Sequence, residues 1–158
     1  MTAVDLDEVD RGILHMLQKD ARNNSASDIA EEVGVAPNTV RSRIARLEDH
    51  DVIEGYLPHI NYEQAGYQLH VIFVCTVPIS DRESLAEDVL DIEGVVRVIE
   101  TLSGRDNLAV EVVGEDTDDL TTIASQLESL GCSIHEEWFL KNSHVQPFDH
   151  FGEEVVDQ

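Results

Sequence analysis

The first fifty residues carry apolar side chains at helical spacing in three short runs, at 6–18, 25–33 and 35–50. Asp7 stands where a side chain can cap the first turn of the first run. Gly34 separates the second run from the third and suits the left-handed residue that ends a helix. The pattern predicts three helices, the last two joined by a tight turn as in a helix-turn-helix unit.

The third run has one apolar stripe, formed by Val40, Ile44 and Leu47. Pro37 suits its first turn, because the missing N–H of proline has no helical partner there. Small polar groups and arginines occupy the rest of the helix, as a helix that reads the major groove requires. A surface helix with a few arginines is the alternative. The candidate DNA-contacting residues are Asn38, Thr39, Arg41, Ser42, Arg43 and Arg46.

Residues 52–60 alternate between apolar and polar positions and contain Pro58. This pattern predicts a short strand, either a wing or an arm exchanged within a dimer. The periodicity changes from helical to strand-like after residues 61–68, which we expect to form a linker.

The second half of the chain alternates strand and helix signals. β-branched and aromatic residues predict strands at 69–77, 95–102, 108–113 and 133–140, with helices between the first two and the last two. Ser80 and Glu83 have the spacing of a capping box for the first of these helices. The order β-α-β-β-α-β indicates a ferredoxin-like sandwich. The predicted fold is α+β, with an N-terminal winged helix-turn-helix and a C-terminal ferredoxin-like βαββαβ sandwich.

Two helices on one side of a four-stranded sheet leave the other side uncovered. We expect that face to be apolar and to require a partner, which predicts a homodimer or a larger assembly. Its candidate residues are Val71, Phe73, Cys75, Val98, Val110 and Trp138.

Charge changes this picture in one respect. The chain has a net charge of −23, yet no acidic residue occurs from Val33 to Leu47. Residues 1–50 carry six bases and ten acids, whereas residues 51–158 carry four bases and twenty-three acids. Acids spread over a periodic, foldable sequence indicate a solvated surface adapted to very high salt, as in halophilic archaea, rather than a disordered acidic protein.

No apolar run approaches the roughly 18 residues that cross a membrane, and the N-terminus lacks the basic and apolar segments of a signal peptide. We therefore expect a cytoplasmic protein with no membrane partner. Cys75 and Cys132 then indicate buried thiols rather than a disulfide.

Five segments in this order and spacing resemble the Lrp/AsnC (feast/famine) family of transcriptional regulators. The matching segments are 6–14, 29–35, 39–48, 52–56 and 103–108. The resemblance implies binding of double-stranded DNA through the third helix and assembly into dimers, tetramers or octamers. It also implies a possible amino acid or other small-molecule effector near the turn of the second domain. The implied domains are 1–60 for DNA binding, 61–68 as linker, 69–141 for dimerisation and sensing, and 142–158 as a C-terminal tail.

The family motif assigns an effector-binding role to the turn between two strands. Backbone N–H groups at a glycine turn can bind a carboxylate, and an aspartate can bind an α-ammonium group. A plain hairpin turn is the alternative, because Gly and Asp favour turns in any case. Ala36 departs from the serine often found before Pro37, and Arg105 replaces a common aromatic residue and favours an acidic effector. The motif residues are Thr101, Ser103, Gly104, Asp106 and Asn107.

Other chemistry finds little support in the sequence. The histidines have neither a close pair on one helix face nor a cysteine at metal-binding spacing, and no arrangement of catalytic residues is present. We expect no enzyme activity, cofactor or metal. The alternatives are a sirohaem decarboxylase-like subunit on the same scaffold and an effector-sensing partner that does not bind DNA. The histidines are His15, His50, His59, His70, His135, His144 and His150.

Overall fold

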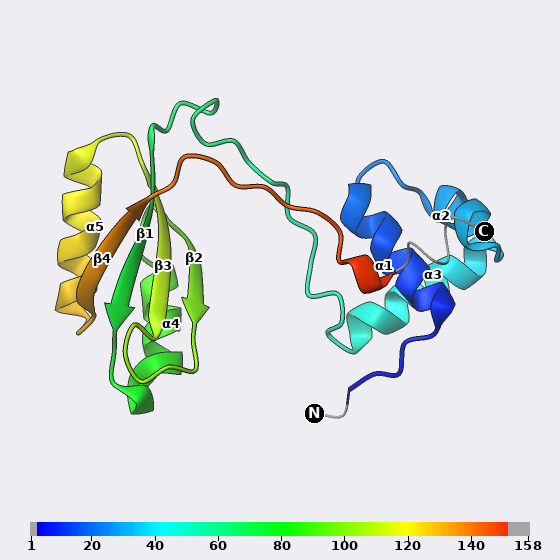
Figure 1. Cartoon of the computed structure of the whole chain (residues 1–158), viewed down its shortest axis with the longest axis horizontal. Helices are drawn as coiled ribbons and strands as arrows, with labels where there is room; N and C mark the ends of the chain where they lie inside the picture. Colours follow the sequence, from blue (N-terminus) through cyan, green and yellow to red (C-terminus); the bar gives the residue numbers. More distant parts are fainter. Residues whose placement is uncertain (1–2, 152–158) are drawn as a thin grey trace. The chain divides into compact units, whose positions relative to one another are not determined.

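The computed structural model describes residues 3–151 and divides the chain into two compact units (Figure 1). The first unit contains residues 1–58 together with the segment that begins at His144, and the second contains residues 59–143. Three helices form the first unit: α1 (Glu8–Asp20), α2 (Ala26–Val33) and α3 (Pro37–Asp49).

Capping fixes where these helices begin and end. The Asp7 carboxylate accepts a hydrogen bond from the Asp10 N–H at 2.9 Å, and the Asp10 carboxylate accepts one from the Asp7 N–H at 3.1 Å. Ser25 and Asp28 form the equivalent pair at the start of α2. Gly34 ends α2 with φ of 76° and donates its N–H to a backbone carbonyl, as the sequence predicted.

The apolar stripes of the three helices meet in one core. The stripe predicted on the third helix is confirmed at its two ends, because Val40 and Leu47 are fully buried and Ile44 packs against them. The buried residues of this core are Ile13, Leu14, Ile29, Ala30, Val40 and Leu47.

Within one chain, residues 52–60 form no strand and therefore no wing. The alternative, an arm exchanged within a dimer, stays a prediction. Asp51, with φ of 55°, turns the chain at the end of α3. The N–H groups of Val52 and Ile53 then bind the Leu47 carbonyl at 2.9 and 3.1 Å. A lone strand leaves its backbone groups unpaired, so within one chain the segment closes the helix and packs its two apolar side chains on the core.

Part of the C-terminal tail predicted at 142–158 packs on the first unit. A short 3₁₀ helix, η2 (Asp149–Phe151), contacts α1 (Figure 1). Phe151 packs against the core of the first unit, and the Phe148 N–H donates to the Gln18 side-chain oxygen at 3.2 Å. Residues 152–158 lie outside the described part of the chain.

The second unit is the predicted βαββαβ sandwich. Its four strands form one antiparallel sheet in the order β2-β3-β1-β4, and α4 and α5 contact the strands. The elements are β1 (Leu69–Thr76), η1 (Ile79–Asp81), α4 (Arg82–Leu90), β2 (Val95–Glu100), β3 (Leu108–Gly114), α5 (Thr117–Ser129) and β4 (Ser133–Phe139).

Two local predictions about the second unit differ from the structure. The Ser80 and Glu83 capping box is absent, because η1 precedes α4 directly and Asp81 at the N-cap makes no side-chain bond to the helix. The linker expected at 61–68 belongs to the second unit, where Tyr67 and Ala65 donate their N–H groups to carbonyls in a compact turn.

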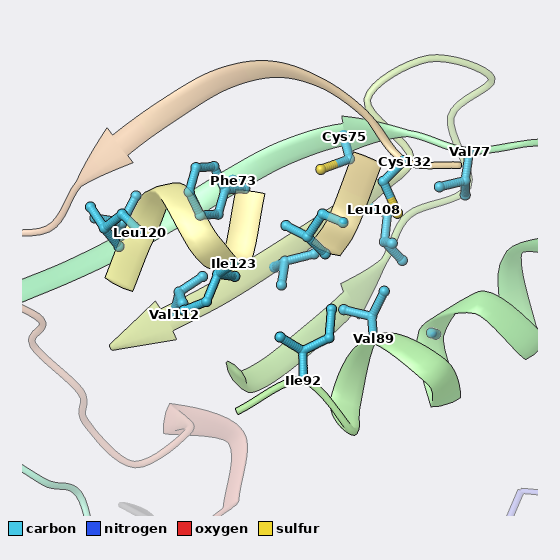
Figure 2. Close-up of a cluster of buried hydrophobic side chains, with 14 residues drawn as sticks. Phe73, Cys75, Val77, Val89, Ile92, Leu108, Val112, Leu120, Ile123 and Cys132 are labelled. Atoms are coloured by element: carbon cyan, nitrogen blue, oxygen red, sulfur yellow. The ribbon is translucent and has the colours of Figure 1, made fainter. Parts of the chain in front are cut away.

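The sequence predicted that one apolar face of the sheet would contact a partner subunit, but in the structure this face is buried against the helices. Phe73 and Cys75 are at most 1% exposed and lie in the core with the helices (Figure 2). Val71 and Val110 are fully buried in the same core, and Val98 packs against it. Of the six expected residues, Trp138 alone lies on the other face, opposite Ile72. The prediction chose the wrong one of the two alternating sets of β1. Each set contains apolar residues, so the pattern alone does not say which set faces the helices.

Both cysteines are buried free thiols, as the sequence predicted (Figure 2). Burial raises the pKa of Cys75 to about 12 and also raises the pKa of Cys132. Both groups therefore stay protonated and unreactive at neutral pH.

We predict that Gly94→Ala destabilises the second unit by roughly 2 to 3 kcal/mol. Gly94 has φ of +90°, and an added Cβ would lie 2.8 Å from the Ile123 Cδ1 and 3.0 Å from the Val113 carbonyl oxygen. Urea unfolding followed by circular dichroism measures the change. Gly104→Ala is the control, because nothing lies within 4 Å of its Cβ position. Equal midpoints for the two variants would contradict the prediction.

Candidate functional site

The exposed side of α3 carries the polar residues that the sequence singled out. Asn38, Thr39, Arg41 and Ser42 are all exposed, while the apolar stripe behind them is packed into the core. Ala36 at the N-cap makes no side-chain hydrogen bond, and Pro37 follows it. The first turn of α3 therefore has no side-chain cap and offers its positive dipole end to an anion.

Arg41 is the arginine of α3 that is not paired with a carboxylate in residues 3–151. Its guanidinium group donates to the Asn38 side-chain oxygen at 2.8 Å. The amide orients the guanidinium but leaves its charge uncompensated. These two side chains together present a donor fork suited to a guanine edge or a phosphate.

Arg43 and Arg46 are held by two aspartates of α1. Arg43 Nη1 lies 2.7 Å from Asp7 Oδ2 and 3.2 Å from Asp10, and Arg46 Nη2 lies 2.5 Å from Asp10 Oδ2. Asp10 is fully buried. The sequence suggested only a capping role for Asp7, because nothing local connects residues more than thirty positions apart.

The charges of this cluster depend on one another. A buried carboxylate is ionised only if cations and donors replace its lost hydration, and here two guanidinium groups do so. The Asp10 N–H and then the Arg43 guanidinium hold the pKa of Asp7 below its usual range. The contribution of Asp7 to stability is therefore present at neutral pH and is lost as the pH falls through that lowered pKa.

The second candidate site is the loop between β2 and β3. Thr101 and Asn107 close it through a backbone hydrogen bond of 3.0 Å. The Thr101 hydroxyl lies 3.1 Å from the Ser103 hydroxyl, which also donates to the Arg105 carbonyl. Asp106 adopts φ of 53°, and its N–H donates to the Thr76 hydroxyl at 3.0 Å. Most predicted effector residues therefore lie together in one ordered turn.

Asn107 differs from the other predicted effector residues. It is fully buried, and its amide accepts a hydrogen bond from the Val77 N–H and donates one to the Val77 carbonyl, both at 2.9 Å. Both of its polar groups are therefore occupied, and it anchors the loop to the end of β1. Sequence reasoning missed Arg82, whose guanidinium donates to the Thr101 carbonyl at 2.6 Å and binds Glu100 at 3.1 Å.

The accessible part of this loop includes its backbone, the Asp106 carboxylate and the side chains of Leu102 and Arg105. Gly104 is exposed, and the Asp106 carboxylate has only a distant ion pair with Arg105, at 3.8 Å. Leu102 is 98% exposed. A turn with free N–H groups, a carboxylate and an exposed apolar side chain can bind a zwitterion once a second surface covers it.

Residues 3–151 contain no cluster of three or more His, Cys, Asp or Glu side chains that could hold a metal ion. The histidines are dispersed: His15 is buried in α1, and His70 binds Glu111 at 2.6 Å. Over the same residues, no helix has the length and apolar character to cross a membrane.

Residues 6–48 match the model of the AsnC-type helix-turn-helix domain. The chain is 35% identical over 120 residues to the transcriptional regulator AldR of Mycobacterium tuberculosis, covering 73% of this chain and 65% of that protein's length. It is 34% identical over 121 residues to the transcriptional regulator LrpA of Pyrococcus horikoshii, covering 76% of this chain and 84% of that protein.

Solved structures share the fold of the whole chain. A transcriptional regulator of Neisseria meningitidis, crystallised as a complex with L-Met, superposes with a TM-score of 0.73 over 92% of this chain and 99% of its own, at 19% identity. The helix-turn-helix match, the identity shared with LrpA and the common two-unit fold establish that this chain belongs to the Lrp/AsnC family.

Proposed function

We propose that this chain is a transcriptional regulator that binds specific DNA sequences by placing α3 in the major groove. The observation that carries the proposal is the exposed face of α3, which has no acidic residue before Glu48 and where Asn38, Thr39, Arg41 and Ser42 surround an uncapped N-terminus. Small donors and acceptors for base edges lie beside one uncompensated guanidinium. The regulators AldR and LrpA, to which the chain is similar, support the same function.

The six candidate DNA-contacting residues then divide into two groups. Asn38, Thr39, Arg41 and Ser42 are free to contact bases and nearby phosphates. Arg43 and Arg46 first fix α3 against α1 and reach phosphates only with their remaining donors. This division assigns specificity to the first turns of α3.

The uncovered face of the sheet is the proposed dimer interface. Trp138 and Ile99 are 51% and 36% exposed there, with Ile72 between them in the strand order. Exposed aromatic and β-branched side chains on one sheet face favour association with a second copy. A dimer would present two α3 helices to half-sites about one DNA turn apart, and dimers can assemble further into tetramers or octamers.

The loop at 101–107 is the proposed effector site. Backbone N–H groups near Gly104 would bind the carboxylate of an amino acid, and Asp106 would bind its ammonium group. The L-Met complex of a regulator with the same fold supports an amino acid as the ligand class. We propose Thr101, Ser103, Gly104 and Asp106 as the contacts, with buried Asn107 as the anchor of the loop.

The net charge of −23 supports a cytoplasmic regulator that works at high salt, in a halophilic archaeon. Counterion release provides less driving force as salt rises, and the Debye length is only about 3 Å at 1 M. Binding must then depend on base contacts and multivalency. Because the dispersed histidines form no shared site among the described residues, a sirohaem decarboxylase-like role is not favoured.

We predict that Arg41→Ala weakens binding to the specific operator roughly 5- to 150-fold, in line with about 1 to 3 kcal/mol for a good base contact. The operator is first selected from random duplexes in potassium chloride buffer, and affinity is then measured by fluorescence anisotropy. Arg22→Ala removes the same charge from an exposed turn of the first unit and should change affinity little. Failure to select any duplex would refute the proposed function.

We predict that Trp138→Glu weakens self-association, because it places a charge on the proposed dimer face. Analytical ultracentrifugation across a concentration series measures the dissociation constant. Leu90→Glu is the matched control, since Leu90 is 52% exposed on α4. If both variants assemble like the parent chain, the interface lies elsewhere.

We predict that Asp106→Asn abolishes the heat of amino-acid binding in calorimetry, because the ammonium group loses its charged partner. Arg105→Ala should selectively weaken glutamate or aspartate. Asp88→Asn, an exposed change on α4, should leave binding unaltered. The absence of heat with all twenty amino acids and the parent chain would contradict the effector proposal.

A further inference from the structure

Two of the three arginines on α3 are neutralised from within the molecule. Asp7 and Asp10 stand at the start of α1 and bind Arg43 and Arg46 directly. The cluster therefore carries no net charge, although α3 itself has no acidic residue before Glu48. A helix that is basic in sequence thus presents one uncompensated guanidinium, that of Arg41.

The two aspartates differ in their access to solvent. Asp10 has a fully buried side chain and binds both arginines, whereas the Asp7 side chain is 50% exposed and binds Arg43 alone. The Arg43 side chain is 31% exposed. Asp10 is thus a fixed anchor, while the contact between Asp7 and Arg43 lies where an incoming anion can reach it.

We propose that Asp7 competes with DNA phosphate for Arg43 and thereby lowers the affinity for DNA of any sequence. This inference rests on the proposed DNA-binding function. A phosphate contact carries no sequence information, so an internal carboxylate on Arg43 weakens specific and non-specific binding by a similar factor. Asp7 also makes the affinity for DNA less dependent on salt, because one fewer phosphate contact releases counterions.

The capping role of Asp7 does not require its charge. Asparagine and serine cap helices about as well as aspartate, because a neutral side-chain oxygen also accepts the N–H hydrogen bond. The ion pair at 2.7 Å is thus a property that the carboxylate adds to the cap. Capping and competition for Arg43 can consequently be separated by substitution.

Asp7→Asn tests the inference, since it retains the cap and removes the exposed one of the two carboxylates that bind Arg43. We expect a random-sequence duplex of twenty base pairs to bind roughly two- to fivefold more tightly, the range set by ion pairs near the surface. The slope of log Kd against log potassium chloride should steepen by about 0.9, the value for one additional phosphate contact. Affinity for the selected operator should rise by a similar factor, because a phosphate contact contributes about equally to every sequence.

Glu8→Gln is the matched control. Glu8 lies in the first turn of α1 beside Asp7, is exposed and loses the same charge, but it makes no ion pair with Arg43. The gain in affinity for the random duplex should also vanish in an Arg43→Gln background, because no guanidinium is then present to contact a phosphate. Asp7→Ser repeats the measurement with a different cap, and circular dichroism checks that each variant is folded.

The outcomes separate the two proposals. A chain that binds no duplex at any salt concentration refutes the proposed function. A chain that selects an operator, but in which Asp7→Asn matches Glu8→Gln in affinity and slope, refutes the role of Asp7 and leaves the function standing. A gain that persists without the Arg43 guanidinium would also overturn the inference, since it would reflect net charge alone.

Discussion

The buried carboxylate of Asp10 is the constraint on which the first unit depends. An ion without solvent must be matched by charge and hydrogen bonds, and removing one partner of a buried pair typically costs about 3 to 5 kcal/mol. Arg43 and Arg46 supply that match from one side of α3. The angle and register of α3 against α1 are therefore set by an ionic contact as well as by the apolar core behind it. This contact therefore also fixes the position of the exposed face of α3.

The same contact explains how an acidic chain presents a surface to DNA. The first unit is acidic overall, yet α3 carries no acid before Glu48, and two of its cations are balanced by partners from α1. Long-range attraction is consequently small, and recognition falls to groups that act at contact distance. Direct hydrogen bonds and packed ion pairs are screened by salt far less than separated surface charges. The arrangement therefore suits DNA binding at salt concentrations at which a regulator with a basic surface loses its affinity for DNA.

Periodicity and capping signals predicted nearly every helix and strand, because these features depend on neighbours within a few residues. Asp7, Gly34 and Pro37 are examples. The failures concern contacts that sequence spacing does not record. The prediction of which side of β1 faces the helices was wrong because each side contains apolar residues. Residues 52–60 have no partner strand within the chain. The pairing of Asp10 with Arg46 and the burial of Asn107 depend on the tertiary fold, so local pattern could identify the two sites but not what holds them.

The two candidate sites share one feature, a buried polar side chain beneath the exposed groups. Asp10, His15 and Asn107 are the buried polar or charged residues of the described chain, and two of the three lie directly beneath a site. Asp10 fixes α3 through side chains, and Asn107 fixes the loop at 101–107 through the Val77 backbone. A buried polar group with all its partners satisfied permits few alternative arrangements, because each alternative leaves an unpaired group out of water. An apolar core tolerates repacking more readily. Placing polar anchors under the exposed reading face and under the exposed turn therefore gives each site a defined geometry while its own polar groups remain free for a ligand.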